Sequence, residues 1–156
     1  MDNKLLSLAD KKIEQMEHFN DITSKIIYED IDGVGELIEN RQEIITALDG
    51  ISAEMRQYVS EQSIERQTAI NKVLQSEDIN NLTDELIELQ GKIKIMTGLR
   101  EEIKRNDKAA VDRLKMLRDE AYEGLKKSMK NKQTINYYAP NSGGNLSNGS
   151  KLNISK

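Results

Sequence analysis

Side chains that could perform acid–base or nucleophilic chemistry are few in this sequence, and they are poorly spaced for it. The only histidine, His18, stands between Glu17 and Phe19, a position typical of a solvated surface histidine. Neighbouring carboxylates such as Glu101 and Glu102 would point to different sides of a helix, so they would not converge on one substrate. No glycine loop follows a strand. This pattern predicts a protein that is not an enzyme.

The chain has no cysteine, and this removes disulfides, thiolate zinc sites and cysteine nucleophiles together. We therefore expect no metal site and no cofactor. The lack of cysteine also fits a reducing compartment. Because the sequence shows neither a signal-peptide core nor an apolar run of 18 residues, we expect a cytoplasmic protein that does not insert into membranes.

The residues best suited to binding another protein are two adjacent tyrosines, Tyr137 and Tyr138. They precede the only proline, Pro140, in a segment rich in Asn, Ser and Gly. Tyrosine combines apolar area with a hydroxyl group and is over-represented at binding hot spots. A segment of this composition buries too little apolar surface to order itself. We predict a flexible recognition tail over 132–156; the alternative is that the tyrosines fold back onto the helices.

The distribution of charge argues against nucleic acid as a partner. All 27 acidic residues precede Lys132, whereas three of the 23 basic residues lie from Lys132 onward. Residues 1–131 therefore hold 20 basic and 27 acidic residues, a net charge of −7. Binding to nucleic acid needs a basic face that releases counterions. We expect no nucleic-acid partner.

The elements that must position these residues are helices. Charged residues make up 32% of the chain and aromatic residues 4%, a mix typical of long helices or coiled coil. Alternating steps of four and three residues trace a seam in which ten of twelve positions are apolar. Its members are Leu82, Leu86, Leu89, Ile93, Met96, Arg100, Ile103, Asp107, Ala110, Leu114, Leu117 and Ala121.

Helical periodicity predicts three helices, over about 2–28, 33–75 and 79–131. Asp30 or Asp32 can cap the second. These three helices predict an all-α fold, and short connections make neighbouring helices antiparallel. We therefore predict an elongated antiparallel three-helix bundle or coiled coil with a long C-terminal helix, forming one helical domain over residues 1–131.

Folding the predicted helices at their connections gives a first register. Residues 2–58 and about 96–120 would form the bundle, and 60–75 with 79–95 would form a two-helix extension. Arg41 would lie level with Asp112, and Asp107 would have no obvious partner. We interpret such polar seam residues as fixing the alignment of the helices; the alternative is a bundle held loosely enough to open.

The last turns of the third helix, over 122–131, would overhang this bundle, and they are the best place to look for a partner. Leu125 and Met129 there sit on a track beside the seam. Four lysines, Lys126, Lys127, Lys130 and Lys132, lie within these turns and directly after them. We interpret them as offsetting the negative end of the helix dipole; the alternative is a docking surface for an acidic partner.

Three features together match the pattern of one family. They are an acidic all-helical plan, an acidic break at residues 28–32 followed by a Leu-rich helix with Arg41-Gln42, and a tail of paired tyrosines, glycines and a final patch at 152–156. On these features the chain resembles the FlgN family of flagellar type III export chaperones. The smaller residues at 108–111 depart from that pattern.

The resemblance implies a cytosolic, non-enzymatic chaperone, monomeric or weakly self-associating. It would bind hook–filament junction (hook-associated) proteins before secretion and deliver them to the cytosolic domain of the membrane export gate. We expect a cargo helix to lie along the apolar track of the third helix. The resemblance places gate binding at Tyr138, or at Tyr137 as the nearest competitor. It places cargo binding at Leu114, Leu117, Ala121, Tyr122 and Leu125.

Two other functions fit the same sequence. One is that of a FliT-like chaperone for the filament-cap protein, although that sister family is usually shorter and lacks a long tail. The other is that of a structural coiled-coil adaptor that dimerises through the seam of residues 82–121. A monomer would favour the chaperones, and a stable elongated dimer would favour the adaptor.

Overall fold

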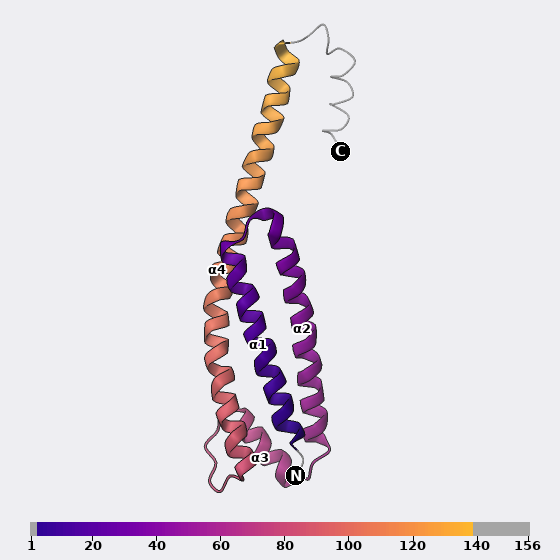
Figure 1. Ribbon diagram of the computed structural model, residues 1–156, viewed down its shortest axis with the longest axis vertical. Coiled ribbons are helices and arrows are strands. Elements are labelled where there is room, and N and C mark those ends of the chain that lie inside the picture. Colours follow the sequence, from indigo (N-terminus) through magenta and orange to yellow (C-terminus); the bar gives the residue numbers. More distant parts are fainter. Residues whose placement is uncertain (1–2, 139–156) are drawn as a thin grey trace. The chain divides into compact units, whose positions relative to one another are not determined.

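The computed structural model describes residues 3–138, with side chains up to residue 132, as four α-helices. These are α1 (Lys4–Tyr28), α2 (Ile31–Ser60), α3 (Ile64–Leu74) and α4 (Asp84–Tyr138) (Figure 1). The described residues contain no strand, so the prediction of an all-α helical bundle with a long C-terminal helix is confirmed. The chain divides into two compact units, Met1–Leu114 and Lys115–Lys156.

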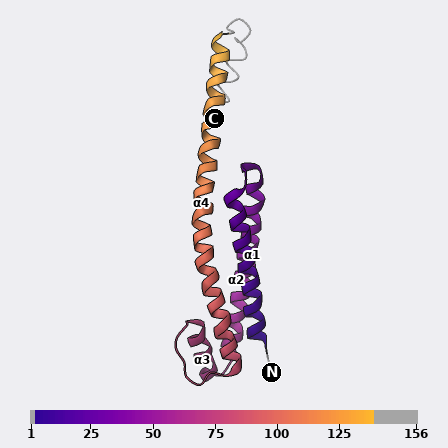
Figure 2. The ribbon, with the colours of Figure 1, turned by 60° about the vertical axis from the view of Figure 1, so that its left-hand side comes forward.

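In the first unit, α1 runs parallel to α4, and α2 runs antiparallel to both (Figures 1 and 2). Polar contacts give the register between α1 and α4. Lys92 forms an ion pair with Asp10, and the Asn20 amide donates to the Glu102 carboxylate at 3.1 Å. At the α1–α2 connection, the Arg113 guanidinium donates to the Glu29 carbonyl at 3.0 Å. The offset in sequence is nearly constant, as expected of two parallel helices.

The core of this unit is one apolar cluster to which all four helices contribute. Burial of each Leu or Ile side chain stabilises the fold by about 1.5–3 kcal/mol. A smaller cluster of Phe19, Ile22 and Ile44 lies beside it. The large cluster consists of Leu5, Leu6, Leu8, Ala9, Met16, Met55, Tyr58, Val59, Ile70, Val73, Leu86, Leu89, Ile93 and Met96.

The prediction of one helix over 33–75 is wrong, because the chain breaks between α2 and α3. Ser63 occupies the N-cap of α3, and its hydroxyl accepts a hydrogen bond from the Arg66 backbone N–H at 3.3 Å. The Gln67 side chain donates to the Ser60 carbonyl at 3.2 Å. These bonds satisfy backbone groups that a helix end exposes. The predicted helix therefore ends at Ser60, and a separate helix begins at Ile64.

Helix α3 ends in a Schellman motif, which turns the chain back. The Glu77 N–H donates to the Lys72 carbonyl at 2.9 Å, and the Ser76 N–H donates to the Val73 carbonyl at 3.0 Å. Ser76 has a φ of 60°. Helix α4 then begins at Asp84 instead of about residue 79. The Thr83 hydroxyl caps it by accepting from the Leu86 N–H at 3.3 Å.

This turn corrects the predicted register. There is no separate two-helix extension, because Ile70 and Leu86 belong to the same cluster as Leu5. The beginning of α4 is drawn into the bundle, so the pairing of α2 with α4 shifts by about one and a half turns. Arg41 therefore forms an ion pair with Asp107, at 2.7 Å, and does not lie level with Asp112 as predicted. Asp30 holds the N-cap of α2 as predicted, but its side chain makes no capping hydrogen bond.

The second unit contains the last turns of α4. The helix continues to Tyr138, beyond the predicted limit of residue 131. The predicted flexible tail over 132–156 therefore begins inside a helix, and residues 139–156 lie outside the described residues. Within the described part of the chain, no helix is both long enough and apolar enough to cross a membrane.

Candidate protein-binding site

The described end of α4 carries a continuous run of exposed side chains. Every side chain from Arg118 to Lys132 is exposed. Three of them are large and apolar: Tyr122 and Leu125 are each 58% exposed, and Met129 is 38% exposed. Steps of three and four residues place them on one face of the helix. We call Tyr122, Leu125 and Met129 the apolar track.

Local charge pairs support the helix around this track. The Lys126 ammonium lies 4.7 Å from the centre of the Tyr122 ring, and it is 3.8 Å from a Glu123 carboxylate oxygen. Arg118 pairs with Asp119 at 3.2 Å. Each exposed contact of this kind contributes at most about 1 kcal/mol. The Lys126 ammonium lies over the Tyr122 ring, and the ring nevertheless remains 58% exposed.

The lysines beside the track do not mark the end of the helix. Since α4 continues to Tyr138, its last turn contains no basic residue. The dipole effect falls off within the last turn, so it does not account for the lysines from Lys126 to Lys132. Residues 124–132 contain four lysines and no acidic residue. The apolar track therefore lies in a basic stretch of an otherwise acidic chain.

The five residues that the resemblance assigns to cargo binding fall into two groups. Leu117 is buried, at 6% exposed, and Leu114 is partly buried, so neither side chain is free to bind another protein. Ala121, Tyr122 and Leu125 are exposed. The assignment omitted Met129, although its spacing of four from Leu125 was a usable signal.

The two predicted gate-binding residues are the last residues of α4. Tyr137 and Tyr138 are helical, and their side chains lie outside the described residues. The prediction that one of them contacts an export gate stays a prediction.

The seam proposed for dimerisation is used within the first unit. Leu86, Leu89, Ile93 and Met96 are all buried in the large cluster with residues of α1, α2 and α3. A second copy could reach them only if this unit opened. The adaptor alternative therefore loses the surface on which it depended.

Polar side chains fix the helices instead of forming a reactive centre. Arg66 of α3 donates to the Tyr58 hydroxyl at 3.2 Å and to the Glu85 carboxylate at 2.8 Å. These two hydrogen bonds raise the pKa of Arg66. Arg41 stacks 4.6 Å above the centre of the Phe19 ring while it binds Asp107. Each arginine links neighbouring helices and fixes their register, which the apolar cluster alone would leave undefined.

In the described part of the chain, His18 and the carboxylates do not gather into a metal site. His18 is exposed. No group of three or more His, Cys, Asp or Glu side chains there could hold a metal ion. In the described part of the second unit, the apolar track is the candidate surface for a protein partner.

Comparison with known proteins gives no relative from which a function could be transferred. No protein family, no curated protein and no solved structure matches the chain. The track, its lysines and the resemblance of the sequence to FlgN chaperones are therefore the features that bear on function.

Proposed function

We propose that the protein is a cytoplasmic, non-enzymatic flagellar type III export chaperone of the FlgN kind. It binds hook-associated junction proteins before their secretion and passes them to the export gate. The observation that supports this most is the exposed apolar track on α4. A helix that is polar on its other faces and carries Tyr122, Leu125 and Met129 along one face is typical of a surface that another protein covers.

The binding mode that we propose is the packing of a cargo helix along the track. A terminal helix of the junction protein would lay its own apolar residues against Tyr122, Leu125 and Met129. Acidic residues on the cargo would pair with the lysines at 126–132, which favours a partner of opposite charge. Masking the cargo helix in this way would prevent its premature assembly.

The size of the track sets an expectation for affinity. Tyr122, Leu125 and Met129 are 58%, 58% and 38% exposed, so covering what remains accessible contributes about 2–5 kcal/mol. Association costs at least about 4 kcal/mol in lost translational and rotational freedom. The track alone would therefore bind very weakly, and neighbouring surface must take part. We therefore expect cargo to contact Ala121 as well, and the complex to be reversible, as release at an export gate requires.

Delivery to the gate is assigned to a different part of the chain. In this proposal Tyr138, or Tyr137, contacts the cytosolic domain of the gate while the cargo stays on the track. The two contacts are separate along the helix, so one can be removed without the other.

The experiment is a pair of pull-downs with purified junction protein and the gate domain. Leu125→Ala/Met129→Ala should weaken cargo binding at least tenfold and leave gate binding unchanged. Tyr137→Ala/Tyr138→Ala should do the reverse. Ile87→Ala/Ile95→Ala is the matched control, since both isoleucines are exposed on the same helix, at 53% and 52%. Equal loss of both partners in either variant would contradict the division of roles.

Self-association through the track is the competing explanation. Two copies of residues 124–132 would bring together eight lysines and no carboxylate, so like charges disfavour it. Light scattering of the isolated protein should give a monomer or a weak oligomer. The filament-cap protein, tested in the same pull-down, distinguishes the FliT-like alternative: it should bind more weakly than a junction protein.

A further inference from the structure

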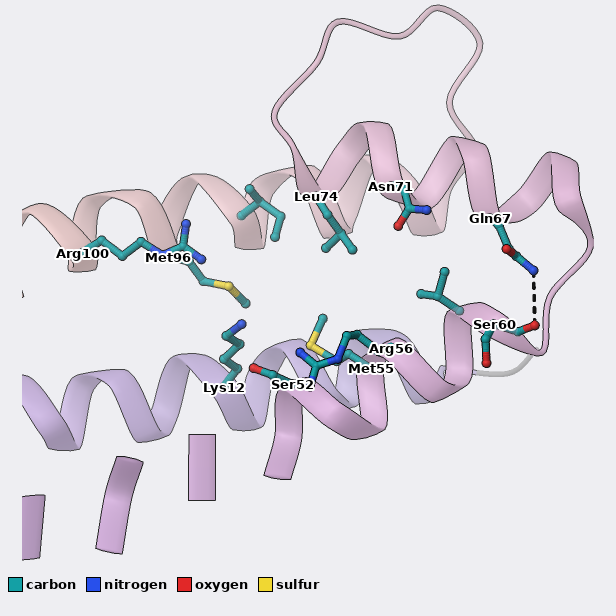
Figure 3. Close-up of a pocket in the computed structure, with 12 residues that line it drawn as sticks. Lys12, Ser52, Met55, Arg56, Ser60, Gln67, Asn71, Leu74, Met96 and Arg100 are labelled. Carbon is teal, nitrogen blue, oxygen red and sulfur yellow. Dashed lines mark hydrogen bonds between the residues drawn. The ribbon is translucent and has the colours of Figure 1, made fainter. Parts of the chain in front are cut away.

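A cavity of about 400 Å³ lies in the first unit, among all four helices (Figure 3). None of its lining residues belongs to the apolar track. Its apolar wall includes Met55 from α2 and both Ile93 and Met96 from α4. A volume of this size is in the range of small-molecule sites, about 300–1,000 Å³. It is too small to seat a partner helix.

Three cationic side chains from three different helices reach this one cavity. Figure 3 shows Lys12 extending from α1, Arg56 from α2 and Arg100 from α4 toward a shared space beside Met55 and Met96. None of the lining residues is acidic. The cavity thus combines an apolar wall with three positive charges.

These three cations form no ion pair, whereas several other basic residues of the bundle do. Lys92 and Arg113 each have a carboxylate within 4.0 Å, as Arg41 and Arg66 do. Within the described residues, Lys12, Arg56 and Arg100 form no ion pair. Arg56 and Arg100 are exposed, and Lys104 and Arg105 likewise form no ion pair within the described residues. What distinguishes Lys12, Arg56 and Arg100 is that they line one cavity whose lining contains no carboxylate.

The electrostatics of Lys12 show that the charges affect one another. Burial lowers the pKa of Lys12, and the charges of Arg100 and Arg56 lower it further. Like charges held together in a partly desolvated place are unfavourable unless an anion joins them. A bound anion would offset the mutual repulsion of these charges.

We propose that this cavity binds a small amphipathic anion, with one anionic head on an apolar body. The head would lie among Lys12, Arg56 and Arg100, because guanidinium groups bind carboxylates and phosphates through paired hydrogen bonds. The body would lie against Met55, Met96 and Ile93, since methionine adapts its shape to irregular ligands. The site is independent of the proposed chaperone function.

The direct test is a titration with octanoate, followed by NMR of the methionine methyl groups. The Met55 and Met96 methyls should shift and saturate, whereas those of Met116 and Met129, which lie outside the cavity, should not. Octanol has the same body without the charge and should bind at least tenfold more weakly. Octyltrimethylammonium and inorganic phosphate should cause no saturable shift.

A pair of variants tests the role of the cations. Arg56→Gln/Arg100→Gln should weaken octanoate binding at least tenfold and leave the helical circular dichroism unchanged, since neither arginine has an ion pair to lose. Lys104→Gln/Lys108→Gln makes the same change in net charge at exposed positions outside the cavity, and it should bind octanoate like the unchanged protein.

Four results would overturn the proposal. They are equal binding of octanoate and octanol, no saturable shift at the Met55 and Met96 methyls, shifts of similar size at all four methyls, and unchanged affinity in Arg56→Gln/Arg100→Gln. If that variant fails to fold, the comparison of octanoate with octanol on the unchanged chain decides alone.

Discussion

Two stretches of the same helix, α4, have similar apolar spacing and opposite surroundings. Leu86, Leu89 and Ile93 are buried in the core, whereas Tyr122, Leu125 and Met129 are exposed. The α1–α2 connection lies level with Arg113, which donates to the Glu29 carbonyl. The helices that cover the first stretch therefore end there. The comparison shows that apolar spacing alone does not separate a buried stretch of a helix from an exposed one; the supply of covering helices does.

The two stretches also differ in how their charges are used. In the first, Arg66 and Arg41 bind carboxylates on α4 and fix its register. In the second, residues 124–132 hold four lysines without any acidic residue. Lys126 pairs with Glu123, just outside this range, but residues 124–132 still carry an excess of positive charge. This difference supports an acidic cargo.

The largest effect should come from the same truncation made in each stretch. Leu89→Ala removes a side chain that is fully buried, so it should lower the free energy of unfolding by about 2–5 kcal/mol. Leu125→Ala should change it by less than about 0.5 kcal/mol. Urea denaturation measures both. Similar losses would mean that Leu125 is part of a core.

Removal of a carboxylate should also destabilise the protein more in the first stretch than in the second, but with a smaller difference than the leucine truncations give. The side chain of Glu85 is 8% exposed and binds Arg66, so Glu85→Ala should cost about 1–3 kcal/mol. Asp119 pairs with Arg118 and is 70% exposed. Asp119→Ala should therefore lower the free energy of unfolding by less than about 0.5 kcal/mol. Thermal denaturation tests the pair. A costly Asp119→Ala would contradict the view that pairs of the second stretch are superficial.

Replacement of serine by glycine should change the stability in opposite directions at two positions. Ser76 has a φ of 60° in the Schellman motif, so Ser76→Gly should stabilise the chain by about 0.5–1 kcal/mol. Ser128 lies inside the exposed part of α4, so Ser128→Gly should destabilise the helix by about 0.5 kcal/mol. Circular dichroism during denaturation gives both values. The same sign at both positions would contradict the assigned backbone conformations.

The smallest effect should be the pH dependence of the contribution that Lys12 makes to stability. Because its pKa in the folded state is below the ordinary value of 10.5, the charged form is penalised on folding. The penalty is full below the folded pKa and is relieved as the pH rises from there toward 10.5. Lys12→Met should therefore stabilise the protein at pH 7, by less than Ser76→Gly does, and this advantage should shrink at high pH. Exposed Lys104→Met should show no such trend.

The helical class and the first helix could be predicted from the sequence because apolar spacing reports local burial directly. The α2–α3 break could not, because Ser63 and Gln67 are compatible with a helix interior as well as with a cap. That break, together with the turn after α3, moved the partner of Arg41 from the level of Asp112 to Asp107. Register depends on the whole path of the chain, so one misplaced turn changes every pairing that follows.

The candidate sites were predictable to different extents. The end of α4 could be singled out in the sequence because its seam fails there, although Leu117 proved buried and Met129 was left out. The anion cavity could not be found in the same way. Lys12, Arg56 and Arg100 belong to three helices, and no spacing in one sequence indicates that they meet.

Hydrogen–deuterium exchange, measured with and without a purified junction protein, tests most directly whether the end of α4 is kept for another protein. The amides of residues 118–132 should exchange rapidly in the isolated chain and become protected when cargo binds. Those of residues 86–110 should be protected in both states. Protection of residues 118–132 without cargo, or exchange there that cargo does not change, would contradict the proposed binding surface.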